Sequence, residues 1–251
     1  MSTNSPDNNS GDTIVSIPRP SKLRPLIDDK EDAGREERVQ ETEFKIRLAN
    51  TEGRRSRASF LIKRRYAWRG YQASPLAANV ANMITLGAFD QGTPIATITV
   101  GIDSPAGLAI EKLYPEEARS LRSSGAHLCE FTKLAVDNMI RSKAVLAAIF
   151  HIAYIYAKRL RGATDLLIEV NPRHVRFYES MLGFKAIGSE KIDPRVNAPA
   201  VLLWLALSYA ESQISQWGGH RELADQTRML YPFFFSAAEE RGIEGRLRSM
   251  E

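Results

Sequence analysis

The sequence predicts an α/β protein with a mixed, mainly antiparallel sheet, flanking helices and a helical C-terminal extension. Strand-like and helix-like segments succeed one another between residues 43 and 206. Some strands are joined by a short turn, which is typical of a hairpin, and others are separated by helices long enough to cross over. Hairpins combined with crossover helices indicate a sheet of mixed direction. The chain contains neither GxGxxG nor GxxxxGKS/T, the phosphate-binding motifs of doubly wound nucleotide-binding sheets.

The strands are predicted from apolar patterns of two kinds. Phe44, Ile46 and Leu48 alternate with charged residues, which is the period of a half-buried strand. Segment 165–170 is almost continuously apolar, so we place it in the centre of the sheet. Gln91-Gly92-Thr93 predicts a hairpin between two other strands. The expected strands are 43–48, 83–90, 94–102, 127–137, 165–170, 184–187 and 201–207.

The helices are predicted from helical spacing and from glycines at their ends. Gly162 and Gly183 stand where a helix-ending glycine belongs. The C-terminal region after residue 206 is helical in pattern, with interruptions at Gly218-Gly219 and Pro232. The other expected helices are 57–71, 109–122, 143–160 and 173–182. The apolar stripe of the first would consist of Phe60, Leu61, Tyr66 and Trp68.

The composition divides the chain into three parts. Residues 1–42 are rich in Ser, Asn, Asp, Glu and Pro, and such a segment buries too little apolar surface to offset its chain entropy. We expect a disordered acidic and polar tail over 1–42. Its segment Ile17–Leu26 could still dock on the main domain. Residues 43–206 then form the main domain, and 207–251 form the C-terminal helical extension.

The overall composition excludes several classes of protein. The chain is 43% hydrophobic and 25% charged with a formal charge of +4, as expected for a soluble globular domain. The single cysteine, Cys129, allows no internal disulfide and favours a reducing compartment. With four histidines besides, a dedicated zinc site is not expected. The longest apolar run, Ala144–Ala157, is too short for a spanning helix, which needs about 20 residues. We find no signal peptide, and expect a cytoplasmic protein, with peripheral membrane association left open.

Two stretches carry most of the functional signal. One runs from Cys129 to Asp137 (CEFTKLAVD) and the other from Glu169 to Tyr178 (EVNPRHVRFY), followed by Leu182-Gly183-Phe184. The second resembles the N…FY…LGF segment of the GCN5-related N-acetyltransferase fold. The first resembles the acyl-homoserine lactone synthases on that fold. With GIDSPAGL at 101–108 and LYPEE at 113–117, the chain is most similar to their relatives, the N-acyl amino acid synthases, over about 43–206.

The resemblance implies an enzyme that joins a long-chain acyl group to the amine of an amino acid. The donor would be an acyl-phosphopantetheine thioester, on acyl carrier protein or coenzyme A, with no tightly bound cofactor and direct attack in a ternary complex. One alternative is an acyl-homoserine lactone synthase, against which the GIDSPAGL segment and Lys133 argue. Another is a catalytically inactive module that binds acyl groups or the carrier. A nucleic-acid-binding module is a distant third alternative, because nucleic-acid-binding domains are usually more strongly basic.

Four residues are candidates for the chemistry. Glu130 is the leading general base or ammonium holder, because the resemblance puts a functional glutamate there and burial would raise its pKa; the alternative is a structural ion pair. Lys133 would bind the substrate carboxylate or pair with Glu130. Residues three apart in a regular strand point to opposite faces, so the pairing with Glu130 needs a β-bulge. Tyr178 would protonate the leaving thiolate, or pack in the core. His174 lies one helical turn before Tyr178 and could be a base, a hydrogen-bond partner or a surface residue.

The neighbours of these residues are expected to bind substrate. Asp103 could hold the amine, although a turn aspartate often caps its own backbone. Phe131 and Thr132 follow Glu130 directly, and Asn171 ends the central strand. Cys129 would point away from Glu130 and serve as a small buried residue.

Basic residues are expected to receive the donor. No acid lies between Arg54 and Arg69, and such a patch would steer an acidic carrier protein to its site; the alternative is a solvated helix face. Segment 138–143 has no glycine for a nucleotide pyrophosphate, although two of its cations could meet a single phosphate. The aromatic segment 231–235 and the strand near Trp204 offer surface for an acyl tail, or pack the extension. The expected carrier- and phosphopantetheine-binding residues are Arg54, Arg55, Arg57, Arg64, Arg65, Arg141 and Lys143.

Overall fold

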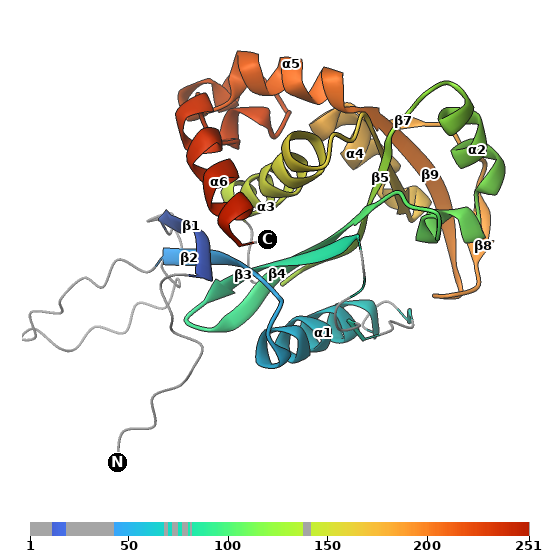
Figure 1. Ribbon diagram of the computed structural model, residues 1–251, viewed down its shortest axis with the longest axis horizontal. Coiled ribbons are helices and arrows are strands. Elements are labelled where there is room, and N and C mark those ends of the chain that lie inside the picture. The colour runs from blue at the N-terminus through green and yellow to red at the C-terminus, as the bar shows by residue number, and fades with distance from the viewer. Residues whose placement is uncertain are drawn as a thin grey trace, which may run out of the picture.

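A computed structural model describes residues 12–18, 43–67, 70–71, 75–76, 80, 82–137 and 142–250. These residues form a nine-stranded sheet with helices against both of its faces (Figure 1). The order across the sheet is β1-β2-β3-β4-β5-β6-β9-β7, and β8 pairs with β9. The strands are β1 (Thr13–Pro18), β2 (Glu43–Leu48), β3 (Met83–Asp90), β4 (Thr93–Ile102), β5 (Leu128–Val136), β6 (Asp165–Val170), β7 (Lys185–Ala186), β8 (Lys191–Asp193) and β9 (Ala198–Ala206).

The sheet is mixed and mainly antiparallel, as the sequence predicts. Of the described pairs only β5 and β6 run parallel, and they pair over just three residues each, Leu128–Glu130 with Asp165–Leu167. Beyond these residues both strands continue without pairing to each other. The sheet therefore opens between β5 and β6, and this gap positions the site.

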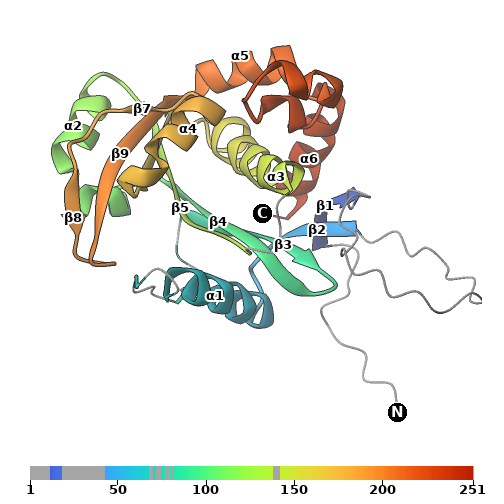
Figure 2. The same cartoon turned by 180° about the vertical axis from the view of Figure 1, so that it is seen from behind.

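Helices cover the two faces unequally. α1 (Glu52–Ala67) lies alone against one face of the central strands, while α3 (Lys143–Tyr154) and the C-terminal helices lie against the other (Figures 1 and 2). Helix α2 (Pro115–Ser123) lies at the end of the sheet near β8 (Figure 1). The remaining elements are η3 (Ala109–Lys112), η4 (Ile155–Leu160), η5 (Pro172–His174), α4 (Val175–Leu182), α5 (Leu207–Trp217), η6 (Arg221–Gln226), η7 (Tyr231–Phe233) and α6 (Ala237–Ser249).

A β-bulge interrupts β5 beside the gap. Thr99 pairs with Thr132 and Thr97 pairs with Ala135, so Lys133 and Leu134 together oppose one residue of β4. Lys133 takes a left-handed conformation, with φ of 50°. The buried Thr97 hydroxyl donates a hydrogen bond to the Lys133 carbonyl at 3.0 Å and fixes the bulge. The peptide groups on either side of Lys133 are thereby turned out of the regular ladder.

The expectation of a disordered tail over 1–42 is wrong for six of its residues. Thr13–Pro18 form β1, which pairs antiparallel with β2 and buries Ile14 and Ile17 completely or nearly so. These two residues are three apart, yet both reach the core because the register of β1 shifts near Val15. The irregular spacing hides the strand from a search for strict alternation. Most of the segment Ile17–Leu26 lies outside the described residues.

Helix α1 begins five residues earlier than predicted, at Glu52. Its buried face consists of Arg54, Ala58, Leu61 and Ile62, which recur at helical spacing. Phe60, expected in the core, is 65% exposed because it lies on the opposite side of the helix from Ala58 and Ile62. Trp68 lies outside the described residues.

The predicted helix 109–122 is two elements, η3 and α2. Pro115 is the first residue of α2 and lacks an N–H, and the residue before a proline is driven out of the helical region. Tyr114 accordingly takes φ −128° and ψ 56°. The short strand β8 and the beginning of β9 were not expected, whereas α4 ends at Gly183 with φ of 81°, as predicted.

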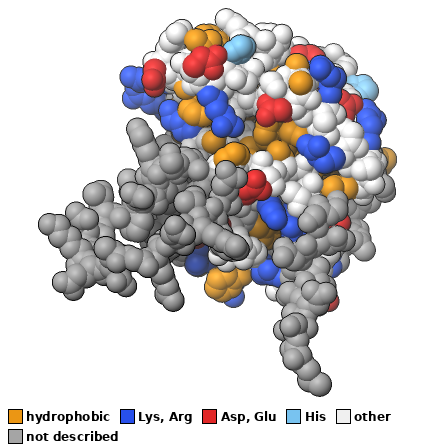
Figure 3. Space-filling model, turned by 90° about the vertical axis from the view of Figure 1, so that its left-hand side faces the viewer, with side chains coloured by type: hydrophobic (Ala, Val, Ile, Leu, Met, Phe, Trp, Pro, Cys, Tyr) orange, Lys and Arg blue, Asp and Glu red, His pale blue; other side chains and the backbone are white. Residues whose placement is uncertain are grey.

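The C-terminal extension is helical and packs against α3. The aromatic segment after α5 contributes the buried side chains of Tyr231, Phe234 and Phe235 to the same core cluster as α3. His151 of α3 stacks on the rings of both phenylalanines. These aromatic residues are therefore filled core positions, which contradicts their interpretation as open surface for an acyl tail. Around the extension, on the face viewed in Figure 3, cationic, acidic and apolar side chains are interspersed.

No helix within the described ranges has both the length and the apolar character needed to cross a membrane.

Candidate active site

A cavity of about 670 Å³ occupies the gap between β5 and β6. Phe131–Val136 of β5 line it, as do Ile168–Val170 of β6 and the following Asn171. These parts of β5 and β6 are not paired with each other. Helix α1 contributes Ile62, Arg65 and Tyr66, while α3, α4 and the β8–β9 hairpin close the other sides. The volume lies within the range of about 300–1,000 Å³ that is typical of ligand sites.

One wall of the cavity is apolar and aromatic. Phe131, Phe150 and Tyr178 line it, and the Phe150 ring lies 6.4 Å from the ring of each of the other two. Leu146 and Phe177 extend this wall along α3 and α4. The wall can hold a hydrocarbon chain against packed rings.

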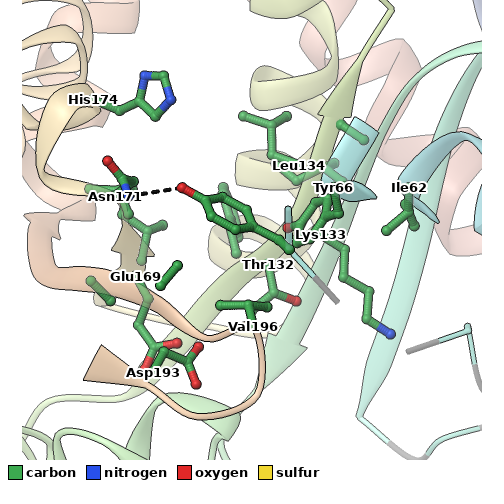
Figure 4. A pocket seen from close by; sticks show the side chains of 18 of the residues that line it. Ile62, Tyr66, Thr132, Lys133, Leu134, Glu169, Asn171, His174, Asp193 and Val196 are labelled. Atoms are coloured by element: carbon green, nitrogen blue, oxygen red, sulfur yellow. Dashed lines mark hydrogen bonds between the residues drawn. The ribbon is translucent and has the colours of Figure 1, made fainter. Parts of the chain in front are cut away.

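The opposite end of the cavity is charged. Glu169 of β6 and Asp193 of β8 lie beside each other there (Figure 4), and both form ion pairs with Arg195. Arg195 also donates to the Ala109 carbonyl at 3.0 Å. Burial is the main cause that raises the pKa of Glu169 to about 7, against the lowering effect of Arg195. The cavity thus joins an apolar wall to an end with two carboxylates and one guanidinium.

The structure does not bring Glu130 to the cavity. Glu130 is 2% exposed and is not among the cavity-lining residues. Its two oxygens accept the backbone N–H groups of Ala109 at 3.0 Å and Ile110 at 3.1 Å. A Cβ atom on Gly101 would lie 3.0 Å from this carboxylate, so glycine leaves the room it needs. Burial raises the pKa of Glu130, as expected, but the side chain anchors η3 to the sheet.

Lys133 lines the cavity without pairing with Glu130. Its ammonium points away from Glu169 and Asp193 (Figure 4) and lies 3.4 Å from the Pro75 carbonyl. Burial lowers the pKa of Lys133. Lys133 also lines a second, smaller cavity of about 260 Å³ between β3 and α1. The bulge expected in this strand is present, but it does not bring Lys133 and Glu130 together.

Tyr178 of α4 and His174 of η5 both line the cavity. The Tyr178 ring lies edge-on to the rings of Phe150 and Phe184. The His174 ring nitrogen lies 3.3 Å from Arg173 Nε. The two residues extend the aromatic wall towards the surface.

Of the residues expected to bind substrate, Phe131, Thr132 and Asn171 line the cavity, whereas Asp103 does not. The Asn171 side-chain amide donates to the Tyr71 hydroxyl at 2.9 Å, which ties β6 to the segment after α1 (Figure 4). Asp103 accepts two hydrogen bonds from Arg122, at 2.6 and 2.8 Å, and one from the Ser104 backbone. This ion pair holds Asp103 at the turn, which corrects its expected role at the amine.

The basic cluster is mostly committed to the fold. Arg54 is 3% exposed and pairs with Asp12 at 2.9 Å, so it cannot receive a carrier protein. Arg55 and Arg57 donate to the backbone carbonyls of Asn50 and Gly92.

Part of the cluster nevertheless remains at the surface. Arg64 is half exposed and pairs with Asp137, while Arg65 lines the cavity. Lys63 is exposed beside them. The surface of α1 thus offers fewer cations than its sequence predicts.

Two further predicted residues lie at or next to the start of α3. Lys143 is exposed at the first turn, with its ammonium 5.7 Å from the centre of the Phe233 ring. Arg141 lies outside the described residues. Cys129 is fully buried on the face of β5 opposite Glu130, and burial raises the pKa of its thiol. Within the residues that the structure describes, His, Cys, Asp and Glu side chains form no group of three that could hold a metal ion.

Sequence reasoning missed the charged end of the cavity. Glu169 is an acid between the apolar residues Ile168 and Val170 of β6, and a charge within a central strand is a signal that could have identified it. Asp193 and Arg195 lie in a hairpin that the sequence pattern did not predict, so their meeting with Glu169 could not be foreseen.

Comparisons with known proteins agree with this geometry. The family model of the N-acyl amino acid synthase FeeM matches residues 57–206. The solved structure of FeeM, an N-acyl amino acid synthase from uncultured soil microbes, is 27% identical, with a TM-score of 0.63, and covers 68% of this chain and 95% of that one.

Other solved structures are more distant. They include a putative N-acetyltransferase from Lactobacillus plantarum (18% identity, TM-score 0.49, 65% of this chain and 98% of that one). An acyl-CoA N-acyltransferase from Pseudomonas aeruginosa is 14% identical, with a TM-score of 0.48, over 66% of this chain and 99% of that one. A comparison with curated proteins found no match. With the sheet, the gap between β5 and β6 and the family match taken together, the chain is an acyltransferase of the GCN5-related fold and belongs to the N-acyl amino acid synthase FeeM family.

Proposed function

We propose that this protein transfers a long-chain fatty acyl group from an acyl–carrier-protein thioester to the amino group of an amino acid. The observation that carries the proposal is the form of the cavity. The same cavity, in the gap between β5 and β6, holds an aromatic wall and an acidic end. The apolar wall suits the acyl chain of the thioester and the acidic end suits the amine, so the two substrates can meet in this cavity.

The β5 bulge can stabilise the oxyanion that forms when the amine attacks the thioester. Lys133 and Leu134 both line the cavity and together oppose a single residue of β4. Backbone N–H groups released from a ladder in this way are fixed dipoles, and such donors stabilise a developing oxyanion without reorganisation. The Thr97 hydroxyl that holds the Lys133 carbonyl at 3.0 Å keeps the bulge rigid.

The leaving thiolate can take its proton from Tyr178. The ring lies in the aromatic wall on the side of α4, where the donor's acyl chain would lie, and His174 is one turn away on the same cavity surface. A direct attack in a ternary complex needs no protein nucleophile, and the buried Cys129 thiol, whose pKa is raised, is unsuited to such a role.

A carrier protein is the donor we favour over free coenzyme A. The sequence at 138–143 has no glycine for a close approach to a nucleotide pyrophosphate. The exposed side of α1 presents Phe60 together with Lys63 and Arg64, a surface that suits an acidic protein with an apolar contact.

The proposal is tested by mass spectrometry of lipid extracts from cells that express the protein. We expect species that fragment into a fatty acyl group and a free amino acid. They should disappear with Thr132→Trp, which fills the cavity, and persist with the exposed control Thr93→Trp. If the folded wild-type protein binds acyl–carrier protein but forms no such lipid, the protein is an acyl-binding module and not a synthase.

A further inference from the structure

Glu169 has one oxygen that the fold leaves without a partner. Its Oε2 pairs with Arg195, but its buried Oε1 accepts no hydrogen bond from any described residue. The side chain is only 10% exposed, and it lines the cavity at the end of β6. A buried carboxylate oxygen without a hydrogen-bond donor is unfavourable. The position therefore suits a donor that arrives with the substrate.

The charges around Glu169 favour a cation as that donor. Asp193, from β8, is nearly buried, and Arg195 serves both carboxylates at once. Glu130, from β5, lies close enough behind the site to raise the pKa of Glu169 further. Lys112, from η3, lines the cavity too, but it is exposed at the surface. The buried and partly buried charges thus comprise three carboxylates and one guanidinium.

We propose that Glu169 receives the ammonium group of the acceptor amino acid through Oε1 and removes a proton from it before the amine attacks the thioester. This inference rests on the proposed function and assigns the acceptor side of the same site. A primary ammonium brings three N–H donors, one of which can bond to the unpartnered oxygen. Its positive charge would offset the excess of negative charge around Glu169. Asp193 accepts from the same guanidinium, so Arg195 holds the two carboxylates next to each other.

The pKa of Glu169 fits this role. At about 7, the carboxylate is partly ionised at neutral pH and is a stronger base than an ordinary glutamate. Glu130 lies on the same face of the sheet, but its two oxygens already accept backbone N–H groups and it does not line the cavity. Glu130, which the sequence favours as the base, thus supports η3, whereas Glu169 lines the cavity.

The acyl transfer consumes one ammonium form of the amino acid and one thioester. The ammonium gives one proton to Glu169, which later releases it to solvent. The amine nitrogen forms a C–N bond with the thioester carbon, and the tetrahedral intermediate collapses with cleavage of the C–S bond. The second nitrogen proton is lost as the amide forms, and the thiolate takes one proton to become the free thiol. The products are one N-acyl amino acid, one thiol and one released proton.

The test compares Glu169→Gln with the exposed control Glu190→Gln in purified protein, with acyl–carrier protein as donor and the amino acid identified from the lipid products. We expect Glu169→Gln to lower kcat at pH 7 by about 10²- to 10⁴-fold, with unchanged binding of the donor. In the wild type, kcat/KM for the amino acid should rise with pH through an apparent pKa near 7, because the ionised carboxylate is the active form. This inflection should be absent from the variant.

A second variant separates the chemistry from any effect on folding. Glu169→Asp keeps the carboxylate on a shorter side chain, so it should retain part of the activity together with the inflection. If Glu169→Gln keeps kcat within about threefold and retains the inflection, Glu169 is not the base although the proposed function stands. If the wild-type protein acylates no amino acid, both proposals fail together.

Discussion

Glu130 and Glu169 lie on neighbouring strands and have opposite surroundings. Glu130 is enclosed and fully hydrogen-bonded to the backbone of η3, whereas Glu169 faces the cavity with one oxygen unpartnered. Burial raises the pKa of both side chains. What distinguishes their roles is therefore access to the cavity, which only the three-dimensional structure shows.

Glu130→Gln should destabilise the protein more than it harms the chemistry. Glutamine keeps one acceptor, but its amide nitrogen would face the N–H of Ala109 or Ile110 and leave a buried donor unpaired. We expect the free energy of unfolding to fall by about 1–3 kcal/mol in urea titrations, and kcat to fall less than in Glu169→Gln. A variant as stable as the wild type but inactive would instead make Glu130 the base.

Some of the residues that the sequence suggested for the site lie together in the structure. Phe131, Thr132, Lys133, Asn171, His174 and Tyr178 all line the cavity, because two strands and the helix that follows β6 were recognised correctly. Asp103 and Arg54 were misplaced because their partners, Arg122 and Asp12, are 19 and 42 residues away along the chain. Ion pairs of such separation leave no local pattern in a sequence.

At the scale of elements, the alternation and hairpin signals predicted β2 to β6 within one residue at each end, and the start of β9 was missed by three. Errors arose where one residue overrides the local pattern. Pro115 divides a predicted helix, and the shifted register of β1 hides a strand in a polar segment. The strand β8 is only three residues long, so its apolar pattern is too short to recognise.

Helix α1 joins the cavity to the surface, and its outer side yields a prediction about the donor. The exposed Phe60 ring lies 6.0 Å from the Arg64 guanidinium, with Lys63 beside them. Lys63→Glu should raise KM for acyl–carrier protein roughly five- to tenfold, equivalent to about 1–1.4 kcal/mol, with kcat unchanged. KM for acyl-CoA should not change.

The matched control is Lys185→Glu, an exposed cation on β7. Steady-state kinetics with both donors at low and high salt measure the effect, which should shrink as salt rises. Equal KM changes for Lys63→Glu and Lys185→Glu would show that α1 does not receive the carrier.

At the scale of the whole molecule, the two distant ends of the described chain stabilise each other. Arg246 of α6 donates to the Ile14 carbonyl of β1 at 2.5 Å, and α6 lies beside β1 (Figure 1). The extension is also tied to α3 through a buried polar group. His151 accepts the Phe235 N–H at 2.9 Å and faces Glu240 at 3.2 Å, and Glu240 accepts from Arg159.

This arrangement predicts that mild acid loosens the fold. Burial lowers the pKa of His151, and its ring nitrogen that accepts from Phe235 cannot also carry a proton. Because the histidine stays neutral when folded but binds a proton near pH 6.5 when unfolded, stability is present above that pH and is lost as pH falls below it. Between pH 7.5 and 5.5 the loss from this group should be at most about 1.4 kcal/mol, the limit for a histidine that stays neutral when folded.

Urea unfolding of His151→Gln tests this directly. Glutamine can accept from Phe235 and donate to Glu240 without titrating, so the acid-dependent loss should be smaller by that amount. The exposed His220→Gln serves as control. An unchanged pH dependence in His151→Gln would place the acid-sensitive group elsewhere.

The central claim is that an acyl group passes directly from a thioester to an amino acid amine. The most direct measurement is a single turnover of purified protein with acyl–carrier protein and a mixture of amino acids, in which mass spectrometry counts amide and a thiol reagent counts free phosphopantetheine. The account predicts one N-acyl amino acid for each thiol released, and no acyl-enzyme. Thiol release without amide, or a stable acyl adduct on the protein, would contradict it.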